Sequence, residues 1–222
     1  MGEYWQTLDP EDIADITKNI TTSAGRLNQL IQKFLDYFKL DLIAGDIEQC
    51  RQWQQQSATG TSKLLIQVLG QKVAKKYQRY SDLCCDLSDA TISISQKWLS
   101  ILVEELLDNA FKFSQPEMLK WVEKTFVEVT SHIEGDRWIL KIQDHGRGMA
   151  ENEIQAIGAY MQFNRMRYEQ QGSGLGLAIA ERIVKIYNGT MTIKSTSNKG
   201  TLVTVSLPLH DDTEMEDLSV IG

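Results

Sequence analysis

A glycine-rich run, QQGSGLGLAIAERIV at positions 170–184, has the composition of a phosphate-binding loop in this sequence of 222 residues. Gly172, Gly174 and Gly176 would let backbone N–H groups approach an anion, and the following helix would present its positive end to the same anion. Leu177 stands where a dinucleotide-binding turn has its third glycine, and the chain contains no Gly-Lys-Ser/Thr tripeptide of a Walker A loop. A flexible hinge has a similar composition, so the run alone leaves both interpretations open.

A second group of polar residues shares one face of an expected helix, within EELLDNAFKFS. Glu105 and Asn109 are four residues apart and Lys112 follows three later, a spacing that makes side chains neighbours on a helix. A carboxylate, an amide and an ammonium could hold a charged ligand with Mg²⁺, which takes few protein oxygens and completes its shell with phosphates and water. A solvated Glu–Lys face is the alternative for these residues taken alone.

The third group is IQDHGRGM, where an apolar strand ends at Asp144 and two glycines, Gly146 and Gly148, permit a sharp turn. A carboxylate at such a strand end could accept a hydrogen bond from the exocyclic amine of a base. An ordinary strand-ending turn is the alternative. His145 has no second His or Cys ligand nearby in the sequence, so we interpret it as a loop residue rather than as a metal ligand or a base.

Alternating helix and strand patterns surround these three groups. Helices are expected near 62–79, 96–113, 151–157 and 175–188, and strands near 82–87, 91–95, 124–133, 137–144, 190–196 and 201–207. The connections between paired strands are too short for helical crossovers throughout. The pattern therefore favours a two-layer α/β (α+β) sandwich with a mixed sheet and three main helices.

The first 40 residues predict one long helix, for which Asp9 is a suitable N-cap and Pro10 a suitable first residue. Its apolar positions recur three and four residues apart, as in a coiled coil: Ile13, Ile16, Ile20, Leu27, Leu30, Phe34 and Tyr37, with Ser23 as the one polar interruption. A lone helix cannot bury such a seam, so a helical hairpin or a dimer is favoured over an ordinary amphipathic helix. Residues 41–61 are polar and without clear period, and are expected to be a linker.

Composition narrows the function further. The formal net charge of −7 disfavours a nucleic-acid-binding protein, which needs a basic face for phosphates. No apolar run reaches the roughly 18 residues of a membrane span, and no secretory leader is recognised, so we expect a cytoplasmic protein. Cys84 and Cys85 are expected to be buried and reduced, and residues 210–222 to form a solvated acidic tail.

In this order the three groups resemble the motifs of the GHKL ATPases, and in particular the catalytic domain of bacterial sensor histidine kinases. EELLDNAFKFS resembles the N box of that family, DHGRGM its first glycine box and GSGLGLAIAERIV its second. Phe163, Asn164 and Arg165 resemble the F box, and NKGTLVTVSLP resembles the closing strand at the adenine pocket. The resemblance covers residues 10–209. It implies the GHKL (Bergerat) fold for 62–209, with ATP and Mg²⁺ as cofactors.

The resemblance implies a role for each matching residue. Asn109 matches the ligand of Mg²⁺, and Glu105 matches a position one turn earlier that orients or activates the attacking group, which we also assign to the metal site. Lys112 matches a residue that contacts the phosphates, and Arg165 is placed where it could stabilise charge on the γ-phosphoryl group. Asp144 matches the carboxylate that binds the adenine amine. The other nucleotide-binding positions implied are Gly146, Gly148, Phe163, Gly172, Ser173, Gly174, Leu175, Gly176, Leu177 and Thr201, with 158–173 as a lid.

The phosphoacceptor histidine of the family has no counterpart in this chain. In the family it lies on the first helix of a hairpin, in a stretch resembling H-E-x-R-T-P, whereas the three histidines here are His132, His145 and His210. Residues 1–40 resemble the second helix of that hairpin, and LDPED resembles the turn before it. A smaller departure is His145, where the family usually has Asn.

The implied function is the Mg-ATP-binding catalytic part of a two-component sensor histidine kinase. It would transfer the γ-phosphoryl group to a histidine on a helix outside this chain, for relay to a response regulator, and the chain alone would show little autophosphorylation. Implied partners are that helix, a receiver domain and a second copy through helix 10–39. The alternatives are a non-catalytic nucleotide-binding interaction module and another small GHKL protein kinase.

Overall fold

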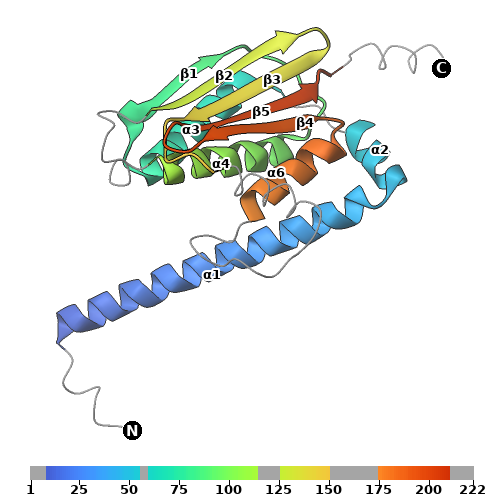
Figure 1. The fold of residues 1–222 in the computed structure, drawn as a ribbon. Coiled ribbons are helices and arrows are strands. Elements are labelled where there is room, and N and C mark those ends of the chain that lie inside the picture. Colours follow the sequence, from blue (N-terminus) through green and yellow to red (C-terminus); the bar gives the residue numbers. More distant parts are fainter. Residues whose placement is uncertain (1–8, 56–59, 115–125, 151–174, 211–222) are drawn as a thin grey trace.

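A five-stranded sheet covered on one face by helices forms the body of the protein, and a long helix lies beneath that helical layer (Figure 1). The computed structural model describes residues 9–55, 60–114, 126–150 and 175–210. Its helices are α1 (Pro10–Ala44), α2 (Ile47–Gln55), α3 (Ser62–Lys76), α4 (Gln96–Phe113) and α6 (Leu175–Ile186), with a short 3₁₀ turn, η2, at Tyr80–Asp82. Its strands are β1 (Leu83–Leu87), β2 (Val127–Glu134), β3 (Arg137–Asp144), β4 (Thr190–Thr196) and β5 (Gly200–Pro208).

The sheet is mixed and has the order β1-β2-β3-β5-β4. β1 and β2 are parallel, so their connection must cross over, and α4 belongs to that crossover. The other pairs are antiparallel. Residues of β3 alternate between buried and partly exposed, because one face of the sheet packs on helices. The predicted two-layer sandwich with a mixed sheet is therefore confirmed.

α4 is the central helix of the buried layer. Its N-cap is Ser95, whose side chain accepts a hydrogen bond from the N–H of Trp98. Its buried residues, at helical spacing, are Trp98, Leu99, Leu102, Val103, Leu106, Leu107, Ala110 and Phe111. α4 packs between α3 and α6 and against β3. The remaining polar face is thus fixed relative to the sheet and to the start of α6.

α1 is the predicted long helix and is longer than expected. Asp9 caps it by accepting hydrogen bonds from the N–H groups of Glu11 and Asp12, and the helix continues to Ala44. α1 packs against α6, and Leu40 and Ile43, near its C-terminus, are buried. The seam residues nearer the N-terminus are exposed: Ile13, Ile16, Ile20 and Leu27 are 50%, 41%, 64% and 58% exposed.

The expectation of a linker at 41–61 is wrong for much of that segment. α1 extends through Ala44, and α2 occupies Ile47–Gln55. Asp46 accepts hydrogen bonds from the N–H groups of Glu48 and Gln49, as a helix N-cap does. The ring of Trp53 stacks on that of Trp98, with centroids 5.5 Å apart, and this contact anchors α2 to α4. The helix was missed because its sequence is polar and its packing depends on one aromatic residue, Trp53.

Two smaller expectations also need correction. Cys84 and Cys85 are free thiols but exposed rather than buried, because β1 is an edge strand of the sheet. Segment 91–95 contributes only an isolated bridge between Ile92 and Leu209 instead of a strand. The expected helix at 151–157, the lid at 158–173 and nearly all of the acidic tail lie outside the described residues. Among the residues that are described, no helix has both the length and the apolarity to cross a membrane.

Candidate nucleotide-binding site

The polar face of α4 runs between two groups of predicted site residues, one at the start of α6 and one at the turn after β3. Glu105 and Phe113 are eight residues apart, which corresponds to about 12 Å along a helix axis. The start of α6 meets α4 beside Glu105 and Asn109, and the turn after β3 meets it at Phe113. The site therefore has two ends, and α4 fixes the distance between them.

Gly176, in the first turn of α6, marks the first end. A Cβ added at Gly176 would collide with Glu105 Oε2 and would lie 3.6 Å from Asn109 Nδ2. Only glycine permits this approach without moving the glutamate. The N-terminus of a helix carries partial positive charge and N–H groups without intrahelical partners, so this end suits an anion.

The side-chain amide of Asn109 has hydrogen-bonding capacity that the described residues do not use. Within the described part of the chain its Nδ2 atom is buried and makes no hydrogen bond. Such a group is costly unless a ligand completes it. The amide offers an oxygen acceptor as well as its N–H₂ donors, so it could meet either a cation or a phosphate. The residues present thus fit Mg²⁺ with its phosphates, because this ion takes few protein oxygens and completes its shell with phosphates and water.

Glu105 already has a partner. Lys33 Nζ of α1 lies 2.7 Å from Glu105 Oε2, and the two side chains are 32% and 12% exposed. An ammonium and a metal ion would compete for that oxygen. The arrangement therefore favours Asn109 as the ligand of a metal, and the role of Glu105 as a ligand stays a prediction. Lys112 lies with its Nζ 5.2 Å from the centre of the Phe113 ring.

Asp144 marks the other end of the site. It is 6% exposed, and its Oδ1 atom accepts a hydrogen bond of 2.8 Å from the N–H of Gly146. Burial raises the pKa of Asp144 above its ordinary value, and hydrogen bonds from Gly146 and Thr201 partly oppose this change. The neighbouring His145 turns to Glu128, with Nε2 and Oε1 2.9 Å apart. His145 lies directly after β3 and outside the strand, which agrees with the prediction of a loop residue.

The turn after β3 is held by close backbone contacts. The N–H of Arg147 donates to the carbonyl oxygen of Phe113, at the end of α4. Gly148 has φ +59°, a left-handed conformation that glycine adopts without strain, and a Cβ there would collide with the carbonyl oxygen of Thr196. The glycines are therefore needed for the approach of the turn to α4 and to the β4–β5 hairpin.

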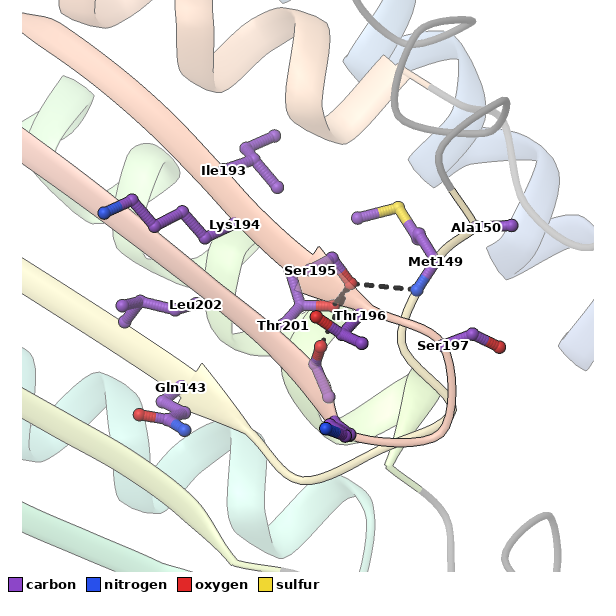
Figure 2. Close-up of a pocket in the computed structure, with 12 residues that line it drawn as sticks. Gln143, Met149, Ala150, Ile193, Lys194, Ser195, Thr196, Ser197, Thr201 and Leu202 are labelled. Atoms are coloured by element: carbon purple, nitrogen blue, oxygen red, sulfur yellow. Dashed lines mark hydrogen bonds between the residues drawn. The ribbon is translucent and has the colours of Figure 1, made fainter.

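An open hollow of about 760 Å³ adjoins this turn (Figure 2). Ser195 lies at its centre: its Oγ accepts from the N–H of Met149, lies 2.9 Å from the hydroxyl of Thr201 and donates to the carbonyl oxygen of Gly200. Sequence reasoning found Thr201 but missed Met149 and Ser195. The signal for Ser195 was its cross-strand register with Thr201, which becomes visible only once β4 and β5 are paired.

Several predicted site residues lie outside the described residues. These are Phe163, Asn164, Arg165, Gly172, Ser173 and Gly174. Leu175 and Leu177, which follow them, are partly buried in the first turn of α6 and pack against the core. Their positions suit core residues that anchor the start of α6.

Comparison with known proteins identifies a matching family and several similar proteins. Residues 94–211 match the family described as histidine kinase-, DNA gyrase B-, and HSP90-like ATPase. Sensor histidine kinase YvrG of Bacillus subtilis is 31% identical over 51% of this chain and 18% of its own length. Phytochrome-like protein Cph1 of Synechocystis is 24% identical over 93% of this chain and 25% of its own. The chain thus spans a quarter or less of these curated relatives.

Two solved structures share the fold. The histidine kinase AdeS of Acinetobacter baumannii gives a TM-score of 0.64 at 17% identity, covering 92% of this chain and 88% of the other. Full-length ShkA, solved in complex with AMPPNP, gives 0.66 at 19% identity, covering 91% of this chain and 40% of the other. Both likenesses include most of the chain, so they extend beyond the matched family domain.

Proposed function

Because this chain belongs to the family of histidine kinase-, DNA gyrase B- and HSP90-like ATPases, and its domain is the catalytic ATPase domain of a sensor histidine kinase, we propose that it binds Mg-ATP between α4 and the start of α6. We propose that it transfers the γ-phosphoryl group to a histidine on a helix outside this chain. A response regulator would then receive the group. The reaction would take place in the cytoplasm, where ATP is present.

One observation carries the proposal: α4 joins two ends with complementary chemistry. At one end, the buried amide of Asn109 faces Gly176 and the positive end of α6. At the other, where α4 ends at Phe113 about 6 Å further along the helix axis, lies the buried carboxylate of Asp144, the last residue of β3. A nucleotide has the matching order, with anionic phosphates at one end and a base that carries an amine at the other.

The chemistry of this site would be positioning and electrostatic stabilisation rather than covalent catalysis. Asp144 would accept a hydrogen bond from the base and so fix the direction of the nucleotide. The N–H groups at the start of α6 would hold the phosphates, with Lys112 as a further cation. Mg²⁺, when bound through Asn109, would neutralise phosphate charge. Arg165 stays a proposed γ-phosphoryl contact.

The test is Mg-ATP titration of Asn109→Ala by calorimetry. Loss of a metal–phosphate ligand should weaken binding roughly 10- to 100-fold, the range seen when residues that support a bound metal are removed. Stability should change little, since the amide nitrogen of Asn109 has no hydrogen bond to lose within the described chain. Asn28→Ala, an exposed asparagine of α1, is the matched control. Unchanged affinity in Asn109→Ala would overturn the assignment.

A non-catalytic nucleotide-binding module is the competing function. It predicts the same Mg-ATP binding but no phosphotransfer when the phosphoacceptor helix of the parent kinase is supplied in trans. Acid-labile label on that helix would exclude it. The exposed seam of α1, including Ile13, Ile16 and Ile20, would serve as the docking face for that helix or for a second copy.

A further inference from the structure

Helix α1 contributes a charged residue to the candidate site although it precedes the matched family domain. Lys33 Nζ lies 2.7 Å from Glu105 Oε2, across 72 residues of sequence. We propose that Lys33 belongs to the triphosphate end of the nucleotide site, as the counter-charge of Glu105. This inference rests on the proposed function, because it assumes that the anion at that end is the phosphate chain of ATP.

The position of Lys33 is fixed by the docking of α1. Leu40 and Ile43, two and three turns further along, are buried against the body of the protein. Arg182 of α6 and Asp41 form an ion pair of 2.8 Å. The ammonium of Lys39 lies 5.4 Å from the centre of the Trp53 ring. Figure 1 shows α1 running along the underside of α6, so Lys33 is presented to the site by a docked helix.

The charge balance at this end explains why a lysine is needed. Glu105 Oε2 is so close to Gly176 that a Cβ there would collide with it, and Gly176 belongs to the first turn of the helix that would hold phosphates. A carboxylate at this place repels an incoming polyphosphate. The ammonium of Lys33 neutralises that carboxylate, and Glu105 in turn holds the flexible lysine beside the anion site.

The effect should be confined to one end of the ligand. Asp144 lies near Phe113, roughly 12 Å along α4 from Glu105, so Lys33 should not influence the base. Affinity for the triphosphate should therefore depend on Lys33 and affinity for adenosine should not. Linkage also requires that a nucleotide which binds better to the docked form strengthens the docking of α1 by the same factor.

The experiment measures affinities of the full 222-residue chain for Mg-ATP and for adenosine. Lys33→Met should weaken Mg-ATP binding about fivefold, the effect of a partly exposed charge pair, and leave adenosine binding unchanged. Lys33→Arg should restore affinity. Lys18→Met, which removes an exposed lysine from the same helix, is the control. In a Glu105→Gln background the Lys33→Met change should cost less than twofold, about the limit of resolution of such double-mutant comparisons.

A second measurement reads docking directly. Amide hydrogen exchange in residues 30–44 should slow when Mg-ATP binds to the wild-type chain, and slow less in Lys33→Met. Equal or tighter Mg-ATP binding by Lys33→Met would overturn the inference. Tighter binding would indicate that docked α1 hinders the binding of the nucleotide. An equal loss for adenosine would assign Lys33 a structural role. If the wild-type chain binds neither ligand, the proposed function fails and the inference falls with it.

Discussion

Replacing Gly148 by alanine should damage the base end of the site through the backbone alone. Gly148 has φ +59°, and a Cβ at this position would overlap the carbonyl oxygen of Thr196 at the end of β4. A backbone oxygen in a hydrogen-bonded hairpin cannot rotate away as a side chain can. The turn after β3 must therefore move away from the β4–β5 hairpin, or the hairpin must distort.

Gly148→Ala should cost stability in two ways, through a left-handed backbone conformation and through steric overlap. Gly135→Ala is a control that shows the first of these alone. Gly135 has φ +61° in the turn between β2 and β3, and a Cβ there would have no atom within 4 Å. Gly135→Ala should thus show only the cost of a left-handed alanine, about 1 kcal/mol. Gly148→Ala adds the overlap, about 1–3 kcal/mol for overpacking. A domain of this size loses about 2–4 °C in Tm per kcal/mol, so we expect losses of roughly 2–4 °C for Gly135→Ala and roughly 4–16 °C for Gly148→Ala.

Thermal unfolding of both variants, with and without Mg-ATP, is the assay. Gly135→Ala should keep the ligand-induced rise in Tm, because its turn is at the opposite end of β3 from Asp144. Gly148→Ala should lose most of that rise, because movement of the turn separates Asp144 from the pocket beside Thr201. Equal Tm losses in the two variants, with equal stabilisation by Mg-ATP, would refute the argument that this close approach shapes the site.

Two further predictions concern charge and thiol exposure. The raised pKa of Asp144 means that the folded state favours its protonated form, so its contribution to stability is present below about pH 3.9 and is lost as pH rises through the folded pKa. Asp144→Asn should remove that loss, so denaturant titrations should find the variant more stable than wild type at pH 7. The variant should nevertheless be unable to bind Mg-ATP. Lower stability than wild type at pH 7 would contradict the expected direction of the change. Cys84 should react with a thiol reagent in the native protein faster than Cys85, whose pKa is raised by desolvation and by its neighbour, as peptide mass spectrometry can check; protection of both would contradict their exposure.

The elements that carry the site were predictable because their signals are local. The bounds of α4 agree with the predicted 96–113, since Ser95 provides a cap and an apolar stripe follows at helical spacing. β3 agrees with 137–144 for the same kind of reason, as alternation follows from one buried face. Asn109, Asp144 and Gly176 could thus be placed on the right elements before any tertiary information.

The contacts that the sequence did not reveal are long-range. Nothing local distinguishes Lys33 from the other lysines of α1, and its partner Glu105 is 72 residues away. Trp53 lies in a polar segment and forms no periodic pattern, so its stacking on Trp98 depends on how α2 returns to α4. Ser195 acquires its contacts with Gly200 and Thr201 from the pairing of β4 with β5. Each of these contacts depends on packing between elements rather than on periodicity within one.

The apolar pattern of α1 continues along the helix, but its two parts have different surroundings. Periodicity identifies the apolar face but not its neighbour: Ile13 and Ile20 are exposed, whereas Leu40 and Ile43 are buried against the body of the protein. The helix has 35 residues, so it spans about 52 Å as one element. A partner that covers the exposed half and shifts the helix would also move Lys33 relative to Glu105. Such a partner should change the affinity for Mg-ATP in the wild-type chain and lose most of that effect in Lys33→Met, which makes Lys33 the residue through which the two surfaces are coupled.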